Sequence, residues 1–139
     1  MRSRRTPAVL ERNTQRQELI LIVEDDPDVG SLLLTALQLE TPYDTRLVSD
    51  GEAALRLITA QKPHLVISDY RLPGMNGLDA TQRIREHQAL RQTPIVAVSA
   101  YGADEYRAIA LKAGCNEYVS TPFEPRALAE LIKTLLATS

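Results

Sequence analysis

The sequence of 139 residues is poor in the features that mark membrane-spanning or disulfide-bonded proteins. Tryptophan is absent, aromatic residues make up 4%, and Cys115 is the single cysteine. An internal disulfide is therefore excluded, and a reducing compartment is indicated. No stretch approaches the roughly 20 consecutive apolar residues of a membrane span, and the first residues contain no apolar core of a signal peptide. We expect a cytoplasmic protein whose core consists of Leu, Ile, Val and Ala side chains.

Charge of one sign is also scarce, since the net charge is only −2, but it is unevenly distributed. Residues 1–17 contain five arginines and one acid, Glu11, which leaves +4 on this stretch and −6 on the remainder. We expect a basic N-terminal arm over residues 1–17 and one domain over residues 18–139. The arm fits a solvated segment, a contact with nucleic acid or a membrane surface, or a segment that docks on a partner. Because no aromatic residue stands between the arginines, we do not expect nucleic acid as the partner. We do not expect a membrane partner either.

Short apolar runs alternate with amphipathic segments from residue 18 onward. Apolar runs of this length, with polar sequence on both sides, are typical of strands buried in a parallel sheet. We expect strands at 19–23, 44–48, 65–67, 94–98 and 116–119, and helices at about 27–40, 51–61, 78–87, 103–113 and 125–137. This alternation predicts a single-domain α/β protein with a doubly wound, five-stranded parallel sheet.

Local signals predict where the helices begin and which faces they bury. Asp26 is followed by proline, which is typical of a helix start with Asp26 as the N-cap. Ser49 and Glu52 fit a capping box, with Ser49 as the predicted N-cap of the second helix. In the first helix, an apolar stripe that includes Leu32 is expected to face the core. Leu34 lies off that stripe and is expected to be exposed, either alone or in contact with a partner.

Three acidic residues follow two of the predicted strands. Glu24 and Asp25 end the strand at 19–23, and Asp69 ends the segment that contains the strand at 65–67. If both strands are central and parallel, these carboxylates meet at the edge where open α/β sheets bind ligands. Such a cluster is costly without a cation, so we expect Mg²⁺ there. The alternative for Glu24 and Asp25 is helix capping.

Several stretches resemble the receiver domains of bacterial two-component response regulators. They are VEDDPDV at 23–29, SDYRLPGMNG at 68–77, VSA at 98–100, AGCNEYV at 113–119, and the pair Pro122-Phe123. The likeness covers about residues 18–137, with the pieces in the family's order and spacing. It implies the flavodoxin-like form of the predicted fold and a stand-alone response regulator that acts through protein contacts.

The resemblance also implies a phosphoacceptor and a metal site. Asp69 matches the aspartate that receives a phosphoryl group from a histidine kinase or a phosphotransfer protein. Mg²⁺ would be held by Asp25, by Asp69 and by the backbone carbonyl of Arg71, with Glu24 acting through water. A few carboxylates, one carbonyl and several waters are the ligands that Mg²⁺ prefers.

Two further positions match the family's conformational switch. Ser99 matches the hydroxyl that donates a hydrogen bond to the phosphoryl oxygens, although a serine at a strand end is also a common turn residue. Tyr118 matches the aromatic residue that moves inward when the hydroxyl moves, and its alternative is a half-buried tyrosine that never switches. The implied output surface, which also fits a homodimer, comprises residues 103–113, 116–119 and 125–137.

The sequence departs from the family at Thr121, where receivers carry a lysine. The three lysines of the chain lie elsewhere, and Arg71 and Arg107 are the candidates for supplying the missing charge. The alternative function is therefore a degenerate receiver, a phosphorylation-independent interaction module. An aspartyl phosphatase of the haloacid dehalogenase type needs a second acid two residues after its nucleophile, where this chain has Arg71. A nucleotide-binding protein needs a glycine-rich loop after the first strand, and none is present. We therefore do not expect an enzyme.

Overall fold

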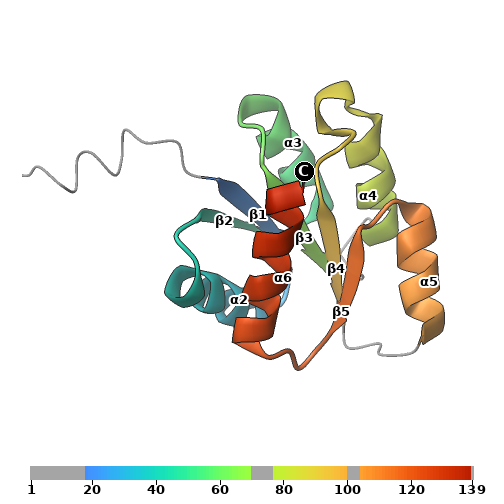
Figure 1. Ribbon diagram of the computed structural model, residues 1–139. Coiled ribbons are helices and arrows are strands. Elements are labelled where there is room, and N and C mark those ends of the chain that lie inside the picture. The colour runs from blue at the N-terminus through green and yellow to red at the C-terminus, as the bar shows by residue number, and fades with distance from the viewer. Residues whose placement is uncertain (1–17, 70–76, 100–103, 139) are drawn as a thin grey trace, which may run out of the picture.

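The computed structural model describes residues 18–69, 77–99 and 104–138 (Figure 1). Five parallel strands form one sheet in the order β2-β1-β3-β4-β5. The strands are β1 (Leu19–Val23), β2 (Asp44–Val48), β3 (Leu65–Asp69), β4 (Ile95–Ser99) and β5 (Glu117–Ser120). The helices are α2 (Pro27–Glu40), α3 (Gly51–Ala60), α4 (Gly77–Glu86), α5 (Asp104–Ala113) and α6 (Pro125–Thr138). The predicted doubly wound, flavodoxin-like fold is confirmed.

Helices cover both faces of the sheet (Figure 1). On one face, α2 and α6 pack on the strands, with Leu33, Leu37, Leu128 and Ile132 buried. On the other face, α3, α4 and α5 contribute Ala54, Ile58, Ala80, Ile84 and Ala110. The central strands β1 and β4 are buried along their whole length because both of their faces are covered.

The face that α2 buries matches the prediction at Leu33, Ala36 and Leu37 but differs from it at Leu32. Leu32 was expected in the core but is 50% exposed, whereas Leu34 packs against the cluster formed with α6. The cause is a close approach to the edge strand β2, because a Cβ atom on Gly30 would lie 3.1 Å from a methyl group of Leu47. This contact turns the Gly30–Leu34 side of the helix inward and leaves Leu32 in solvent.

The predicted N-cap residue is correct for α2 and wrong by one residue for α3. Asp26 caps α2 as predicted, and its carboxylate accepts hydrogen bonds from the backbone N–H groups of Asp28 and Val29. For α3 the cap is Asp50 rather than Ser49, with a 2.7 Å bond from the N–H of Ala53 to the Asp50 carboxylate. A charged acceptor interacts more favourably than a hydroxyl with the positive end of the helix dipole.

An arginine that the sequence did not single out holds together the edge of the sheet where the strands begin. Arg85, near the end of α4, donates from all three guanidinium nitrogens. Its acceptors are the carbonyls of Leu90, Thr93 and Gly114 and the side-chain oxygen of Asn116. The contact with Leu90 involves a short 3₁₀ helix, Gln88–Leu90, that was not predicted. The Arg85 network therefore joins α4, the start of β4 and the connection between α5 and β5.

Candidate functional site

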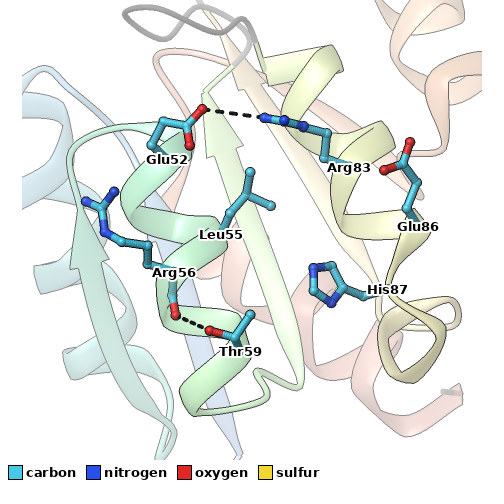
Figure 2. Close-up of a pocket in the computed structure, with 7 residues that line it drawn as sticks. All are labelled: Glu52, Leu55, Arg56, Thr59, Arg83, Glu86 and His87. Carbon is cyan, nitrogen blue, oxygen red and sulfur yellow. Dashed lines mark hydrogen bonds and ion pairs between the residues drawn. The ribbon is translucent and has the colours of Figure 1, made fainter.

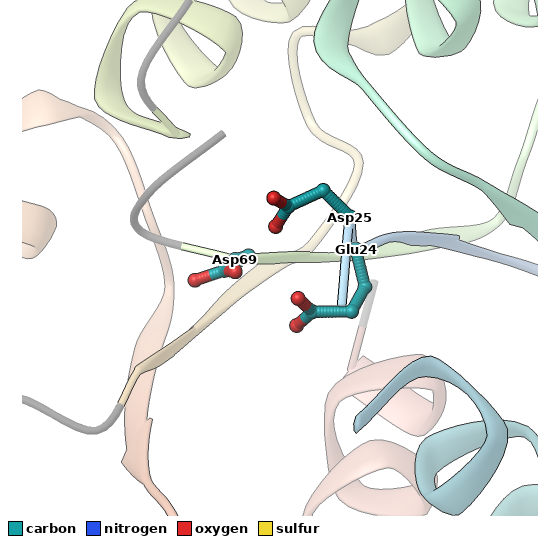
Figure 3. Close-up of side chains that lie close together, drawn as sticks. All are labelled: Glu24, Asp25 and Asp69. Carbon is teal, nitrogen blue, oxygen red and sulfur yellow. The ribbon is translucent and has the colours of Figure 1, made fainter. Parts of the chain in front are cut away.

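Three carboxylates converge at the opposite edge of the sheet, where the strands end. Glu24 and Asp25 follow β1, and Asp69 is the last residue of β3. One carboxylate oxygen from each residue lies within 4.8 Å of the other two, and the side chains point toward one common space (Figure 3). The predicted convergence of Glu24, Asp25 and Asp69 is therefore observed. Glu24 is buried, Asp69 is half-buried and Asp25 is exposed, so the cluster opens to solvent on one side.

The backbone register fixes this arrangement. Val23 of β1 pairs with Ser68 of β3, so the residues that follow each of them, Glu24 and Asp69, lie side by side at the sheet edge. The N–H of Glu24 donates to the carbonyl of Val48 at 2.9 Å and extends the pairing of β1 with β2. Asp26 caps α2 and is not a member of the cluster, in agreement with the sequence-based interpretation.

The crowding of negative charge changes the protonation of Glu24. Burial raises the pKa of Glu24 from about 4.5 to about 8, and a hydrogen bond to Asp69 and the charges of Asp69 and Asp25 act in the same direction. The backbone N–H of Asp26, which donates to Glu24 at 3.1 Å, opposes this rise. In the absence of a cation, Glu24 therefore keeps its proton near neutral pH.

The structure brings Ser99 and Thr121 to the same edge of the sheet. Ser99 is the buried last residue of β4, next to the end of β3, where Val98 pairs with Asp69. The backbone N–H of Thr121 donates to the carbonyl of Ser99 at 2.8 Å, so the two residues are adjacent. Thr121 is partly exposed and brings a hydroxyl group to this position.

Tyr118 lies in the core, and its side chain is only 6% exposed. It packs in the cluster under α3, α4 and α5. Tyr118 pairs with Ala97, and Ser99 pairs with Ser120, so Tyr118 and Ser99 are diagonal neighbours on one face of the sheet. The tyrosine side chain is thus buried, and its role as a switch stays a prediction.

Arg107 and Arg71 are the two candidates for supplying the charge of the missing lysine. Arg107 on α5 is engaged elsewhere, because it forms a 2.6 Å ion pair with Glu117 and donates to the carbonyl of Tyr118. Arg71, including its backbone carbonyl, lies outside the described residues, as do residues 1–17 of the predicted arm.

The donor set suits a small divalent cation. Three carboxylates offer hard oxygen ligands, which Mg²⁺ prefers over nitrogen or sulfur. The open side of the cluster leaves room for the water molecules that Mg²⁺ retains. A cation would also replace the proton that Glu24 otherwise keeps.

A family model for the response regulator receiver domain matches residues 20–133, which is most of the chain. The chain belongs to the receiver domain family. Receiver domains are phosphoacceptor signalling modules of two-component systems rather than classical enzymes. They bind Mg²⁺ in their active site and interact with histidine kinases or phosphotransfer proteins.

The chain has relatives of two lengths. It is 35% identical over 124 residues to the DNA-binding response regulator MtrA of Mycolicibacterium smegmatis, an alignment that covers 89% of this chain and 52% of the relative. It is also 35% identical over 120 residues to an uncharacterized 14.6 kDa protein of Leptolyngbya boryana, covering 86% of this chain and 91% of that protein. The receiver therefore spans about half the length of MtrA and most of the Leptolyngbya protein.

Solved receiver structures superpose closely on the chain. A candidate response regulator from Chloroflexus aurantiacus has a TM-score of 0.84 and 34% identity, covering 88% of this chain and 99% of that one. The receiver domain of the sensor histidine kinase PA1611 from Pseudomonas aeruginosa has a TM-score of 0.80 and 31% identity, with the same coverage. That structure holds a magnesium ion in its active site cleft. No helix in the described part of this receiver is long and apolar enough to cross a membrane.

A pocket lies between α3 and α4 and shares no residue with the carboxylate cluster (Figure 2). It has a volume of about 420 Å³, and a 3.4 Å ion pair between Arg83 and Glu52 bridges the two helices above it. Its remaining charged lining, Arg56 and Glu86, is also of mixed sign. Since opposite charges are balanced across it, this pocket does not select one class of charged ligand.

Proposed function

We propose that this receiver accepts a phosphoryl group on Asp69 from a histidine kinase or a phosphotransfer protein and signals through protein contacts in the cytoplasm. The observation that carries the proposal is the convergence of Glu24, Asp25 and Asp69 at the carboxyl edge of the sheet. Asp69 is the only one of the three that ends the central strand β3 and remains half-buried, which suits a nucleophile that a partner must reach.

The transfer is a displacement at phosphorus. A carboxylate oxygen of Asp69 forms the new P–O bond, the P–N bond to the donor histidine breaks, and its electron pair stays on the imidazole nitrogen, which then takes up a proton. A carboxylate and a phosphoryl group repel each other, so positioning and charge neutralisation account for most of the rate. The product is an acyl phosphate in which Asp69 no longer carries its own carboxylate charge.

The neighbouring residues then have separate roles. Asp25, Asp69 and the backbone carbonyl of Arg71 would hold Mg²⁺, with Glu24 acting through water after it gives up its proton. Bound Mg²⁺ supplies positive charge that offsets the repulsion between the acceptor and the phosphoryl oxygens. The Ser99 hydroxyl donates a hydrogen bond to a phosphoryl oxygen, and its diagonal neighbour Tyr118 couples this change to α5.

The threonine at position 121 favours a second candidate function, that of a degenerate receiver. A lysine ammonium about 4 Å from Asp69 would contribute on the order of 4 kcal/mol before desolvation, and a threonine hydroxyl offers only a hydrogen bond. Phosphorylation adds nearly two negative charges to the site. If the remaining cations do not suffice, the chain acts as a degenerate receiver that binds partners without being phosphorylated.

The output surface that we propose comprises α5, β5 and α6. Ile109 and Leu111 of α5 are 44% and 40% exposed, so this surface offers apolar side chains to a partner. A downstream protein or a second copy of this chain is the partner we assign to this surface.

Intact mass after incubation with acetyl phosphate and Mg²⁺ tests the proposal. We expect a species heavier by about 80 Da, the mass of one phosphoryl group, that is lost in Asp69→Asn and when Mg²⁺ is removed by a chelator. Asp44→Asn changes an exposed carboxylate away from the cluster and is the matched control, which should still gain the mass. No mass gain in the parent protein, or an unchanged gain in Asp69→Asn, would support the phosphorylation-independent function instead.

A further inference from the structure

The edge strand β2 has one side on which no strand of the described chain pairs. In the sheet order β2-β1-β3-β4-β5, β2 pairs with β1 alone and lies at the outer margin of the sheet (Figure 1). All of its residues, from Asp44 to Val48, are exposed or half-buried, whereas those of the neighbouring β1 are buried. An uncovered edge strand offers its backbone groups to another strand. The open side of β2 is therefore a place where the sheet can be extended.

The pairing with β1 decides which backbone groups of β2 face this open side. The N–H of Asp44 and the carbonyl of Val48 bond to the residues that flank β1, at 3.0 and 2.9 Å. Because a strand is pleated with a period of two, Arg46 directs its backbone groups to β1 as well. Thr45 and Leu47 consequently point their N–H and C=O groups to the open side.

The side chains of this segment divide between the two faces of the sheet. Tyr43 packs against the cluster formed by α2 and α6, and Leu47 lies close to Gly30 of α2. Asp44 and Arg46 lie on the opposite face, because side chains alternate along a strand. Both are exposed, and neither forms an ion pair within the part of the chain that the structure describes. The open strand therefore presents one charge of each sign on the same face.

The segment 43–47, Tyr-Asp-Thr-Arg-Leu, is complementary to itself when two copies run antiparallel. With Thr45 on the two-fold axis, Asp44 of each copy lies opposite Arg46 of the other. Tyr43 then lies opposite Leu47, and both kinds of pair are favourable across strands. The two Thr45 residues face each other with their backbone groups on the open side, so they can exchange both hydrogen bonds of an antiparallel pair. One register thus matches the charges, the apolar side chains and the backbone groups.

We propose that two copies of this chain pair through β2 in this antiparallel register and form one continuous sheet. The two-fold axis makes the interface isologous, so each favourable pair occurs twice. The antiparallel arrangement places the two carboxylate clusters at opposite ends of the dimer. β5 lies at the other margin of the sheet, so the output surface that includes α5 and β5 stays free. A short strand buries little surface, so the dimer is weak, and its formation does not depend on phosphorylation.

Sedimentation equilibrium of the full chain tests the pairing. Between about 10 µM and about 1 mM, we expect the average mass to rise from 15.4 kDa toward twice that value. Arg46→Asp places two acids opposite each other at both charged pairs and should raise the dissociation constant at least about tenfold. The double variant Asp44→Arg/Arg46→Asp restores opposite charges and should return to within about threefold of the parent. Arg91→Asp makes the same charge change at an exposed residue outside β2 and is the matched control.

Cysteine cross-linking tests the register. Asp44→Cys and Arg46→Cys proteins that are mixed and oxidised should form a disulfide-linked heterodimer, because facing residues of such a pair have Cα atoms about 4.5 Å apart. The heterodimer keeps one Asp44–Arg46 pair. Either variant alone should cross-link at least about fivefold less, because its two cysteines stand two residues out of register, beyond the reach of a disulfide. The parent protein, treated in the same way, controls for Cys115.

Three results would overturn the proposal. A parent protein that stays monomeric at about 1 mM would leave β2 to a strand of another protein. A dimer that Arg46→Asp does not weaken, but that Ile109→Asp does, would use the surface formed by α5, β5 and α6 instead. Cross-linking of the mixture that does not exceed that of each cysteine variant alone would exclude the antiparallel register.

Discussion

The two edges of the sheet accommodate charged side chains in opposite ways: one clusters like charges, and the other surrounds a single charge with neutral acceptors. Where the strands end, Glu24, Asp25 and Asp69 each bring one carboxylate oxygen within 4.8 Å of the others, and a proton on Glu24 relieves part of the repulsion. Where the strands begin, Arg85 carries one positive charge, and its acceptors are three backbone carbonyls and an amide oxygen. The net charge of the carboxylate edge can therefore change, whereas the charge of the Arg85 edge stays constant.

The carboxylate edge therefore serves function, and the Arg85 edge serves stability, within one small domain. Arg85 donates from all three nitrogens to neutral oxygens and forms no ion pair among the described residues, and an arginine is charged at any physiological pH. A buried carboxylate among other carboxylates changes state with a proton, a divalent cation or a phosphoryl group. Substitutions at the Arg85 edge should therefore lower stability, and substitutions at the carboxylate edge should alter the response to ligands.

The largest effect is expected from Arg85→Ala. Loss of the guanidinium leaves the carbonyls of Leu90, Thr93 and Gly114 without their donor, which should lower the free energy of unfolding by at least about 3 kcal/mol. Urea denaturation measures this loss. Arg83→Ala is the matched control on the same helix, because an exposed ion pair of 3.4 Å contributes at most about 1 kcal/mol. Similar losses in both variants would show that the Arg85 network is not a special support.

The next effect is a dependence of stability on pH that a cation removes. The folded-state pKa of Glu24 is raised to about 8, so the folded protein holds a proton that the unfolded chain releases above pH 4.5. Stability should therefore fall as the pH rises from about 4.5 to about 8, by on the order of 1–2 kcal/mol without a divalent cation. Thermal melting measures it, and Mg²⁺ should stabilise the protein more at pH 8.5 than at pH 5.5.

Glu24→Gln supplies the control for the pH series. This variant cannot ionise at the buried position, so its melting temperature should be flatter over the same pH range. An equally steep fall in Glu24→Gln would show that another group causes the pH dependence.

A smaller effect is expected from Thr121→Lys. An ammonium beside Asp69 favours attack on a phosphoryl donor, and about 1.4 kcal/mol of this attraction at the transition state corresponds to a tenfold faster reaction. The initial rate of Mg²⁺-dependent mass gain with acetyl phosphate measures it. Thr121→Gln has a similar length without the charge and should stay within about twofold of the parent; an equal gain in both variants would exclude a charge effect.

The smallest effect concerns Asp50, an acid at the carboxylate edge that only caps a helix. Asp50→Ala should lower the free energy of unfolding by about 1 kcal/mol because the N–H of Ala53 loses its acceptor. Ser49→Ala should change it by less than about 0.5 kcal/mol, and neither variant should alter the response to Mg²⁺. Urea denaturation with and without Mg²⁺ measures both points. A larger loss in Ser49→Ala would restore the capping box that the sequence predicted.

The fold followed from the sequence because its signals are local. Apolar runs and turn residues predicted the interior strands, and the alternation of elements predicted the edge strand β2, which has only two apolar residues. A parallel sheet with alternating helices left few topologies to consider. The errors arose where distant residues decide. The exposure of Leu32 depends on how closely Gly30 approaches Leu47 of another strand, and no pattern within α2 encodes that contact.

The carboxylate cluster was predictable because strand order alone brings the ends of β1 and β3 together. The raised pKa of Glu24 was not, since it depends on burial and on a hydrogen bond across two strands. The role of Arg85 was equally hidden: an arginine near the end of an amphipathic helix is typical of a solvated face, and its acceptors come from three other segments.

Cys115 has a practical consequence for anyone who studies this receiver. Its thiol is 6% exposed and contacts the Thr81 hydroxyl at 3.5 Å, and burial raises its pKa, so little reactive thiolate is available in the folded state. A cysteine introduced on the surface would thus react first with a fluorophore or spin label. Because Cys115 reacts slowly with thiol-directed labels, it need not be replaced before a single labelled cysteine is introduced for spectroscopy.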